Sequence, residues 1–520
     1  MNKEVAIELR HITKTFGSIT ANKDVDMTVY KGEILAILGE NGSGKTTLMN
    51  MIAGIYYPDA GHIIVNGEEA VIKSPKDAFN YKIGMIHQHF KLVDVFTASE
   101  NIILGVNDGS KYKLSDVNQK VAAIAEKYGF AINPKKKVHE MSVSEKQTVE
   151  IIKVLYRGAD ILILDEPTAV LTPQETEKLF AVLRRMKDDG KSIIIITHKM
   201  HEVLSISDRV AVLRKGEHIA TVVTAETSES ELTEMMVGKK VSLNINRPEP
   251  KNPCDRLIVS HLCANNSEGF KVLDDISFVA RSGEILGIAG IAGSGQRELL
   301  ESIAGLYHVE SGEIFYNNPS SGEKENLRDK TPLQIRDLGV RLSFVPEDRL
   351  GMGLVGNMGI TDNMMLRSYT KGKSMFLDRV PPKNLAKNII KSLEVVTPDD
   401  ETPVRRLSGG NVQKVLVGRE IAAAPSVLMA AYPVRGLDIN SSYLIYNLLT
   451  KQKESGVAVI FVGEDLDVLI ELCDRILVIN GGKVTGTVDG RTAKKEEIGL
   501  LMTRHSSQDQ SKEEISDAEK

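Results

Sequence analysis

The sequence predicts an α/β fold that occurs twice in tandem, each time with a mostly parallel central sheet. The chain has 520 residues, and a single hydrophobic core stops growing at roughly 250–300 residues, so two domains are expected. Long stretches of sequence recur once. Short apolar runs such as EILAILG and ILILDE alternate with helix-like segments such as KTTLMNMIAG, which is the order of buried parallel strands joined by helices.

Three pairs of similar segments define the repeat. GEILAILGENGSGKTTLMNMIAG, in the first half, recurs in the second half as GEILGIAGIAGSGQRELLESIAG. The segments around Ser142 and Asp208 recur around Ser408 and Asp474, and these two spacings are equal. A repeat of this length corresponds to a whole domain and is too long for one unit of a solenoid.

The domain boundaries follow from the repeat and from the composition. We expect a first domain at 1–238, a linker at 239–255, a second domain at 256–504 and a disordered tail at 505–520. Prolines among polar residues make the linker extended, and the tail lacks apolar periodicity. Alternating segments at 5–30 and 60–72 predict a small antiparallel sheet at the start of each domain. NNPSSGEKENLRDK, from Asn317, predicts a surface insertion in the second copy.

The composition is that of an ordinary globular protein, with 42% hydrophobic and 26% charged residues. The net charge of −5 argues against nucleic acid as the main partner, because phosphate binding leaves a basic footprint. Cys254, Cys263 and Cys473 form no zinc or disulfide pattern. The first residues lack the apolar core of a signal peptide, and no run reaches the ~18 apolar residues of a membrane span. We therefore expect a cytosolic chain that meets a membrane only through partners.

A phosphate-binding loop follows the first apolar run. It fits G-x-x-x-x-G-K-[ST] and opens a helix, which is the context this motif requires. Its residues are Gly39, Glu40, Asn41, Gly42, Ser43, Gly44, Lys45 and Thr46, followed by Thr47. The glycines let backbone N–H groups surround phosphates, and the helix N-terminus adds partial positive charge. We expect Lys45 to reach the β- and γ-phosphates of a nucleotide and the Thr46 hydroxyl to ligate Mg²⁺. A glycine turn that only caps a helix is the alternative interpretation.

The run ILILDE, residues 161–166, supplies the second half of such a site. Its apolar residues form a buried strand that delivers Asp165 and Glu166 at its end. We expect Asp165 to hold Mg²⁺, directly or through water, and Glu166 to polarise the attacking water. The alternative is an acidic turn after a buried strand, which the complete phosphate loop makes the weaker interpretation.

Further segments resemble those of one family. LSGGNVQ, from Leu407, resembles the LSGGQ signature of the ABC ATPases, and MSVSEKQ, from Met141, takes its place in the first copy. Gln88, in IGMIHQHF, resembles the glutamine of the family's Q-loop, and His198, in IIIITHKM, resembles its switch histidine. The resemblance covers residues 5–504 and is specific as an ordered set of motifs.

The resemblance implies two tandem P-loop ATPase domains, each with a RecA-like core sheet, a small antiparallel β subdomain and a helical subdomain. It also implies that two such domains pack head to tail. ATP and Mg²⁺ would lie between the phosphate loop of one copy and the signature of the other, here Ser408, Gly409 and Gly410. Gln88 would contact Mg²⁺ and sense a permease, and His198 would contact the γ-phosphate. Phe16, in ITKTFG, resembles the aromatic residue that stacks on adenine, with simple core packing as its alternative.

Segments in the second half of the chain indicate which branch of the family the chain resembles. VPEDRLGMGLV, LSGGNVQK and RGLD resemble the second domain of bacterial tandem importers of simple sugars and nucleosides. DRLGMGLVGNMGITDNMMLRSY favours the nucleoside branch, with ribose or galactose import as the alternative. The resemblance implies two integral-membrane permease subunits, a substrate-binding lipoprotein that acts indirectly, and a peripheral place on the cytoplasmic side of the cell membrane. A tandem ATPase of translation or of DNA repair fits less well, since the linker is short and no zinc pattern or long coiled coil is present.

The two copies are unequal in their phosphate sites. The second loop keeps its glycines, but Gln296 replaces the lysine and Arg297 replaces the Mg²⁺-binding hydroxyl. At the end of the strand that corresponds to ILILDE, Ala431 and Tyr432 replace the two carboxylates. We expect the second copy to be unable to hydrolyse ATP, because Ala431 binds no metal and Tyr432 is no carboxylate base.

The signatures are unequal in the opposite sense. The first copy has Ser144 where a glycine facing the γ-phosphate is expected, followed by Glu145. It also lacks the aspartate that Asp438 supplies in the second copy. Head-to-tail pairing within the chain would gather these defects in one composite site and leave the other complete. We therefore expect intrachain pairing, because a dimer of first copies would place Ser144 and Glu145 in both sites.

Overall fold

The computed structural model describes residues 4–503 apart from short segments, and the chain forms two compact units, Met1–Ser242 and Leu243–Lys520. Outside the description are residues 1–3, 18, 88–89, 107–112, 170, 198, 239–244, 292, 345–352, 367, 370–376, 423, 436, 464 and 504–520. Gln88, His198 and the predicted tail therefore lie outside the described residues.

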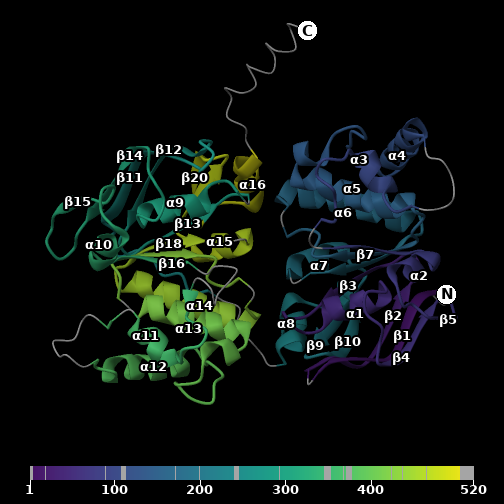
Figure 1. Cartoon of the computed structure of the whole chain (residues 1–520), viewed down its shortest axis with the longest axis horizontal. Coiled ribbons are helices and arrows are strands. Elements are labelled where there is room, and N and C mark those ends of the chain that lie inside the picture. The colour runs from purple at the N-terminus through teal and green to yellow at the C-terminus, as the bar shows by residue number, and fades with distance from the viewer. Residues whose placement is uncertain are drawn as a thin grey trace, which may run out of the picture. The chain divides into compact units, whose positions relative to one another are not determined.

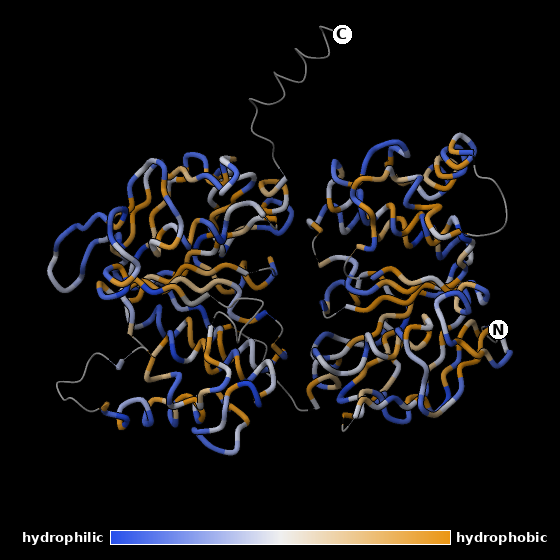
Figure 2. The backbone as a smooth tube through the Cα atoms, viewed as in Figure 1, coloured by the Kyte–Doolittle hydropathy of each residue, from blue (hydrophilic) through white to orange (hydrophobic). Residues whose placement is uncertain are grey.

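The first unit is built on a six-stranded sheet with the order β10-β9-β3-β8-β7-β6 (Figure 1). Its strands are β3 (Ile34–Leu38), β6 (Ile83–Ile86), β7 (Ile161–Asp165), β8 (Ser192–Ile196), β9 (Arg209–Arg214) and β10 (Glu217–Val223). Neighbours are parallel except β9 and β10. β3, β7 and β8 are almost wholly apolar and buried along their whole length, because both faces of the sheet are covered. Figure 2 shows these hydrophobic strands in the middle of the unit.

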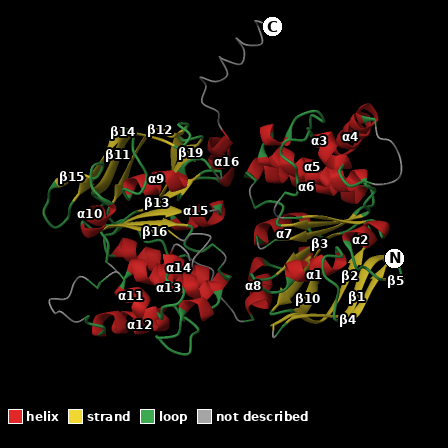
Figure 3. Cartoon of the chain, in the orientation of Figure 1, coloured by secondary structure: helices red, strands yellow, loops and turns green. Residues whose placement is uncertain are grey.

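Two layers cover this sheet, as Figures 1 and 3 show. On one face, α1 (Lys45–Ile52) and the antiparallel sheet β2-β1-β4-β5 share a core with β3. That sheet comprises β1 (Val5–Phe16), β2 (Ile19–Tyr30), β4 (Ala60–Val65) and β5 (Glu68–Ala70). On the other face lie α5 (Val143–Tyr156) and α6 (Pro173–Asp188), and α5 forms a further core with α3 (Ala98–Ile103) and α4 (Leu114–Tyr128). The remaining helices are α2 (Pro75–Asn80), α7 (Met200–Ile206) and α8 (Glu229–Val237).

Helix α1 begins differently from α5 and α6. α5 and α6 begin with capping boxes, formed by Ser142 with Glu145 and by Thr172 with Glu175. In a capping box each side chain accepts a hydrogen bond from the other residue's backbone N–H. α1 instead begins after Gly44, and no side chain caps its first turn. The first turn of α1 is therefore open to an anion that comes from outside the chain.

The second unit repeats this architecture. Its two sheets have the orders β16-β17-β18-β13-β19-β20 and β12-β11-β14-β15, which match the first unit strand for strand. The strands are β11 (Asp255–Asn265), β12 (Lys271–Arg281), β13 (Ile285–Ala289), β14 (Ser311–Asn317), β15 (Lys324–Asn326), β16 (Val340–Phe344), β17 (Val427–Ala431), β18 (Ala458–Val462), β19 (Arg475–Asn480) and β20 (Lys483–Asp489). The helices are α9 (Gln296–Ile303), α10 (Pro332–Asp337), α11 (Ile360–Met365), α12 (Val380–Ser392), α13 (Gly409–Ile421), α14 (Ile439–Glu454), α15 (Leu466–Leu472) and α16 (Lys495–Thr503). The insertion predicted from Asn317 forms the turn and second strand of the β14–β15 hairpin.

The described part of the predicted linker packs against the second unit. Residues 245–254 form no helix or strand, as the prolines predict. Ile245 is nevertheless buried in the core of the second unit, and the Arg247 guanidinium donates to two backbone carbonyls at the end of α15. The buried Lys453 ammonium donates to the Pro248 carbonyl. The composition of the linker could not predict these contacts, because they depend on partners about two hundred residues further along the chain.

Candidate nucleotide-binding site

The phosphate loop of the first unit needs its glycines for steric reasons. Gly42 and Gly44 have φ angles of 82° and 95°, in the left-handed region that favours glycine. A Cβ atom on Gly39 would lie 2.3 Å from the Leu213 carbonyl oxygen, and one on Gly44 would lie 2.4 Å from the Ala21 carbonyl oxygen. Side chains at these positions would push the loop out of the narrow space between β3 and the neighbouring segments.

Lys45 is buried inside this loop, with a relative exposure of 6%. Its ammonium donates to the carbonyl oxygens of Gly39 at 2.7 Å and Glu40 at 2.9 Å. Burial lowers the pKa of Lys45, and the charges of Glu166 and Asp165 oppose that shift. The loop therefore holds a desolvated cation, which is the group that a nucleotide phosphate needs.

The carboxylates predicted from ILILDE meet the loop at the end of β7. Thr46 lies close enough to the Asp165 side chain to exert a lowering effect on its pKa, so the two predicted Mg²⁺ ligands lie near each other. Burial, and then the charge of Glu166, raise the pKa of Asp165, while Thr46 and Lys45 oppose the shift. Such a crowded group of carboxylates gains from a bound cation.

Glu166 has an unusual backbone conformation. Its φ angle is 45°, and its N–H donates to the Ile196 carbonyl at 2.9 Å. A positive φ costs free energy in a residue other than glycine, and such residues cluster at functional sites. The Gln147 side chain, which the sequence did not single out, fixes the next residue by donating to the Pro167 carbonyl at 2.6 Å. The only sequence signal for this contact is that a glutamine, Gln413, stands at the same place in the repeat.

Phe16 ends β1 and is 42% exposed, so core packing does not explain it. Its ring contacts the Tyr56 ring edge-on, with 5.2 Å between the ring centroids. The Lys14 ammonium lies 5.5 Å from the Phe16 centroid. An exposed ring held from the side in this way is available to stack on a base, and Tyr56 is a neighbour that the sequence did not reveal.

Gln88 and His198 are in sequence positions just past the ends of β6 and β8. Both lie outside the described residues, so their roles remain as predicted. In parallel sheets of this kind ligands bind at the carboxyl ends of the strands, the end of the sheet where Asp165 also lies.

The second unit keeps the backbone of this site without its chemistry. Gly293 and Gly295 have φ angles of 84° and 100°, as in the first loop. Gln296 is buried, and its amide donates to the Ile291 carbonyl at 3.1 Å. Tyr432 repeats the strained backbone of Glu166, with a φ angle of 50° and an N–H bonded to a strand carbonyl at 2.9 Å. A neutral amide and a phenol thus occupy the positions equivalent to Lys45 and Glu166.

The two signature segments begin α5 and α13. In the second unit Ser408 caps α13, and Gly409 and Gly410 form its first turn. A Cβ atom on Gly410 would meet only the Leu437 side chain, at an ordinary 3.5 Å. The fold of this unit therefore does not demand glycine there.

In the first unit, the N-terminus of α5 already holds the Glu145 carboxylate. The Glu145 carboxylate accepts from the Ser142 N–H at 2.8 Å and from the Lys136 ammonium at 2.8 Å. Burial favours the neutral form of Glu145. The contacts with Lys136 and Ser142 together outweigh this effect, so the pKa of Glu145 is lowered. A charged carboxylate at a helix N-terminus repels a second anion.

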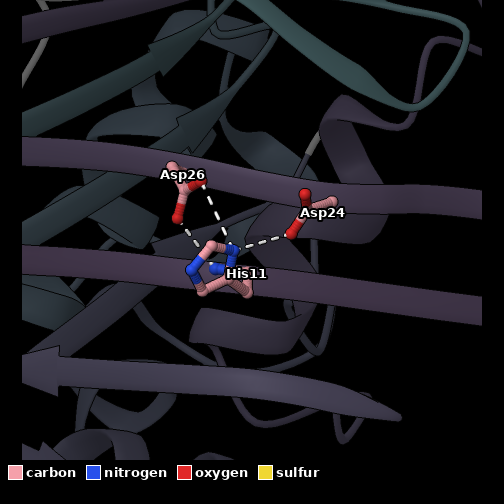
Figure 4. Close-up of side chains that lie close together, drawn as sticks. All are labelled: His11, Asp24 and Asp26. Atoms are coloured by element: carbon pink, nitrogen blue, oxygen red, sulfur yellow. Dashed lines mark hydrogen bonds and ion pairs between the residues drawn. The ribbon is translucent and has the colours of Figure 1, made fainter.

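A separate cluster of His11, Asp24 and Asp26 lies on the small sheet (Figure 4). All three side chains are exposed. His11 lies at an irregularity in the β1–β2 pairing, where Asp26 accepts from its N–H at 2.8 Å and Asp24 bonds its ring at 2.7 Å. The second unit has the same arrangement at His261, whose N–H donates to a serine hydroxyl. The cluster therefore belongs to the pairing of these strands in both units.

A buried lysine in a glycine loop, with two carboxylates at the end of a parallel strand, defines a P-loop nucleotide triphosphatase. The model of the ABC transporter family matches residues 22–169 and 273–433, one stretch in each unit. The chain belongs to the ABC transporter family.

Individual relatives match along almost the whole chain. The chain is 40% identical to the guanosine import ATP-binding protein NupO of Bacillus subtilis, over 96% of this chain and 97% of that protein. It is 40% identical to the nucleoside import ATP-binding protein NupA of Lactococcus lactis, over 96% and 99%. The glucose import ATP-binding protein TsgD13 of Haloferax volcanii is 38% identical over 97% and 96%.

Among solved structures, that of an archaeal ribosome recycling factor, aABCE1, in complex with a ribosomal stalk protein covers 90% of this chain and 87% of its own. The TM-score is 0.58 and the identity 16%. This likeness shows the tandem fold alone.

Proposed function

We propose that this chain is the ATP-binding and ATP-hydrolysing subunit of an importer and that it drives nucleosides through membrane permease subunits. The observation that carries this proposal is the 40% identity, over 96% of the chain, to two proteins named for guanosine and nucleoside import. Proteins named for glucose and ribose import follow at 38% and 34% identity. A monosaccharide is therefore the second candidate substrate.

Uptake by cells tests the substrate. In a strain that lacks this chain, we expect uptake of labelled guanosine to fall and that of labelled ribose to be unchanged. The wild-type gene should restore guanosine uptake, whereas a Glu166→Gln gene, made in equal amount, should not. Loss of ribose uptake with normal nucleoside uptake would favour the sugar instead.

The first unit supports hydrolysis as follows. Lys45 would clamp the β- and γ-phosphates, and Glu166 would orient and polarise the attacking water. Thr46 and Asp165 fit a magnesium ion, because a hydroxyl and a carboxylate lie near each other there and hard cations prefer oxygen ligands. Bound Mg²⁺ would neutralise charge on the phosphates. Gln88 as a further metal ligand, and His198 as a contact of the γ-phosphate, rest on the sequence motifs.

We propose that the signature of the second unit completes this site. Gly410 is a glycine without a steric reason inside its own unit, whereas the corresponding helix end of the first unit is filled by Glu145. On this proposal, the N-terminus of α13 accepts a phosphate, whereas that of α5 does not. Intrachain pairing would therefore give one complete composite site and one degenerate site.

The partners proposed for this chain are two integral-membrane permeases and, indirectly, a substrate-binding lipoprotein. None of the helices in the described part of the chain combines the length and the apolar character that crossing a bilayer requires. We expect the chain to lie on the cytoplasmic face of the membrane through contacts with the permeases. Fractionation of cells with and without the permease genes tests this, and membrane retention without the permeases would contradict it.

A further inference from the structure

A buried network of side chains joins two segments at the carboxyl ends of β7 and β8 in the first unit. Its centre is Glu202, in the first turn of α7, with a relative exposure of 3%. One carboxylate oxygen accepts from the Thr168 hydroxyl at 2.6 Å and from the Thr197 hydroxyl at 3.3 Å. The other lies 3.2 Å from the Lys199 ammonium. Thr168 and Thr197 are themselves buried.

Lys199 closes the network. Its ammonium also donates to the Thr168 carbonyl at 3.2 Å, and its N–H donates to the Thr197 hydroxyl at 3.1 Å. Thr168 lies two residues after Glu166. The segment that begins with Glu166 is thus tied, through one carboxylate, to the residues on both sides of position 198.

The second unit shows what this part of the fold requires. In the repeat, Val434 stands in place of Thr168 and Val468 in place of Glu202. Both valines pack against the core of the second unit, next to the same strands and helix. Gly463 and Asp465 stand there in place of Thr197 and Lys199, so the fold forms in the second unit without any member of the polar network. The unit that contains Glu166 therefore has the polar network, whereas the unit that contains Tyr432 has the two valines.

We infer that Glu202 is a positioning residue for ATP hydrolysis, which acts through Thr168 to hold the Glu166 segment in place relative to the segment after β8. This inference rests on the proposed function, in which Glu166 orients the attacking water. A hydrogen-bonded carboxylate in a buried site has few alternative partners, so it fixes its neighbours in one arrangement. Misplacement of a catalytic group by about 1 Å can lower a rate by about 100-fold.

The test grafts the apolar pair of the second unit into the first. The full chain, assembled with its permeases, carries Thr168→Val together with Glu202→Val. We expect kcat for ATP hydrolysis to fall about 10- to 100-fold, because the catalytic group loses its orientation. KM for ATP should change little, because the phosphate loop is retained. The temperature of unfolding should fall only slightly, because the Lys199 ammonium keeps the Thr168 carbonyl as a partner. The matched control is Val434→Thr in the second unit, which should leave kcat unchanged.

Single substitutions at Thr168 separate hydrogen bonding from packing. Thr168→Val keeps the shape and removes the hydroxyl, whereas Thr168→Ser keeps the hydroxyl and removes a methyl group. We expect the serine variant to retain several times more of kcat than the valine variant. Equal losses, or a larger loss in the serine variant, would show that the site serves packing and would overturn the inference.

The remaining outcomes distinguish this inference from the proposed function. If Glu166→Gln is inactive while the double valine variant keeps the wild-type kcat, only the positioning role fails. If the double variant loses ATP binding or unfolds at a clearly lower temperature, the network is structural and the inference also fails. If Glu166→Gln itself keeps turnover, the proposed function fails.

Discussion

Glu166 and Tyr432 stand at equivalent positions and share a strained backbone, with φ angles of 45° and 50°. Their side chains differ in what they can do to a water molecule, because only the carboxylate can accept its proton at neutral pH. We expect Glu166→Gln to lower ATP turnover about 10²- to 10⁴-fold, the range for loss of a general base. ATP should still bind. Tyr432→Phe should change the rate little.

Steady-state release of phosphate by the full chain, assembled with its permeases, measures both effects. Binding of ATP to the Glu166→Gln variant controls for loss of the site itself. Equal rates in the two variants would mean that Glu166 is not the group that orients water.

At this scale the sequence predicted the parts that a local motif specifies. Lys45, Thr46 and Asp165 lie together as the spacing of the two motifs predicts. The contacts of Tyr56 with Phe16 and of Glu202 with Thr168 were not predicted. Each joins side chains from different segments, and a single sequence has no periodicity or motif that marks such a pair.

At the scale of elements, the strongest prediction concerns the N-termini of helices α5 and α13. Gly410→Asp would place a carboxylate at an end that has no counterpart of Glu145, and repulsion of the γ-phosphate should make it severe. Ser144→Asp adds charge to an end where Glu145 already lies, so it should be much milder. ATPase activity of the two variants, again in the assembled transporter, measures the difference. Equal losses would favour a dimer of separate chains over intrachain pairing.

Buried strands were the most predictable elements. ILAIL, ILILD and SIIII are central parallel strands, and their apolar character follows from cover on both faces. The packing of residues 245–254 was not predictable in the same way. Proline restricts the backbone of a segment, but it does not indicate which surface the neighbouring side chains will contact.

For the whole molecule, the repeat provides an internal comparison of ion pairs. Lys453 and Asp474 lie 2.7 Å apart with side-chain exposures of 1% and 6%, while Lys187 and Asp208, at the equivalent positions, lie 2.6 Å apart at 31% each. We expect Lys453→Ala to destabilise the second unit by about 3–5 kcal/mol, because it leaves a buried carboxylate without its main partner. Lys187→Ala should cost about 0–1 kcal/mol.

Hydrogen exchange of the full chain measures the stability of each unit separately. The second unit should lose protection in the Lys453→Ala variant, whereas the first unit should change little in the Lys187→Ala variant. Similar losses in both would show that burial does not strengthen the pair.

Ala431, which ends β17, cannot bind a metal, and this bears on how steep a solute gradient the transporter can build. In the proposed pairing, one hydrolytic site that fires once in each transport cycle would consume one ATP. Every tenfold step in the ratio of inside to outside solute concentration requires about 1.4 kcal/mol. Under that proposal, the free energy of a single ATP would bound the steepest gradient that this motor could maintain. Two hydrolytic sites firing in each cycle would square that limiting ratio, and the cell would need twice the ATP for every molecule taken up.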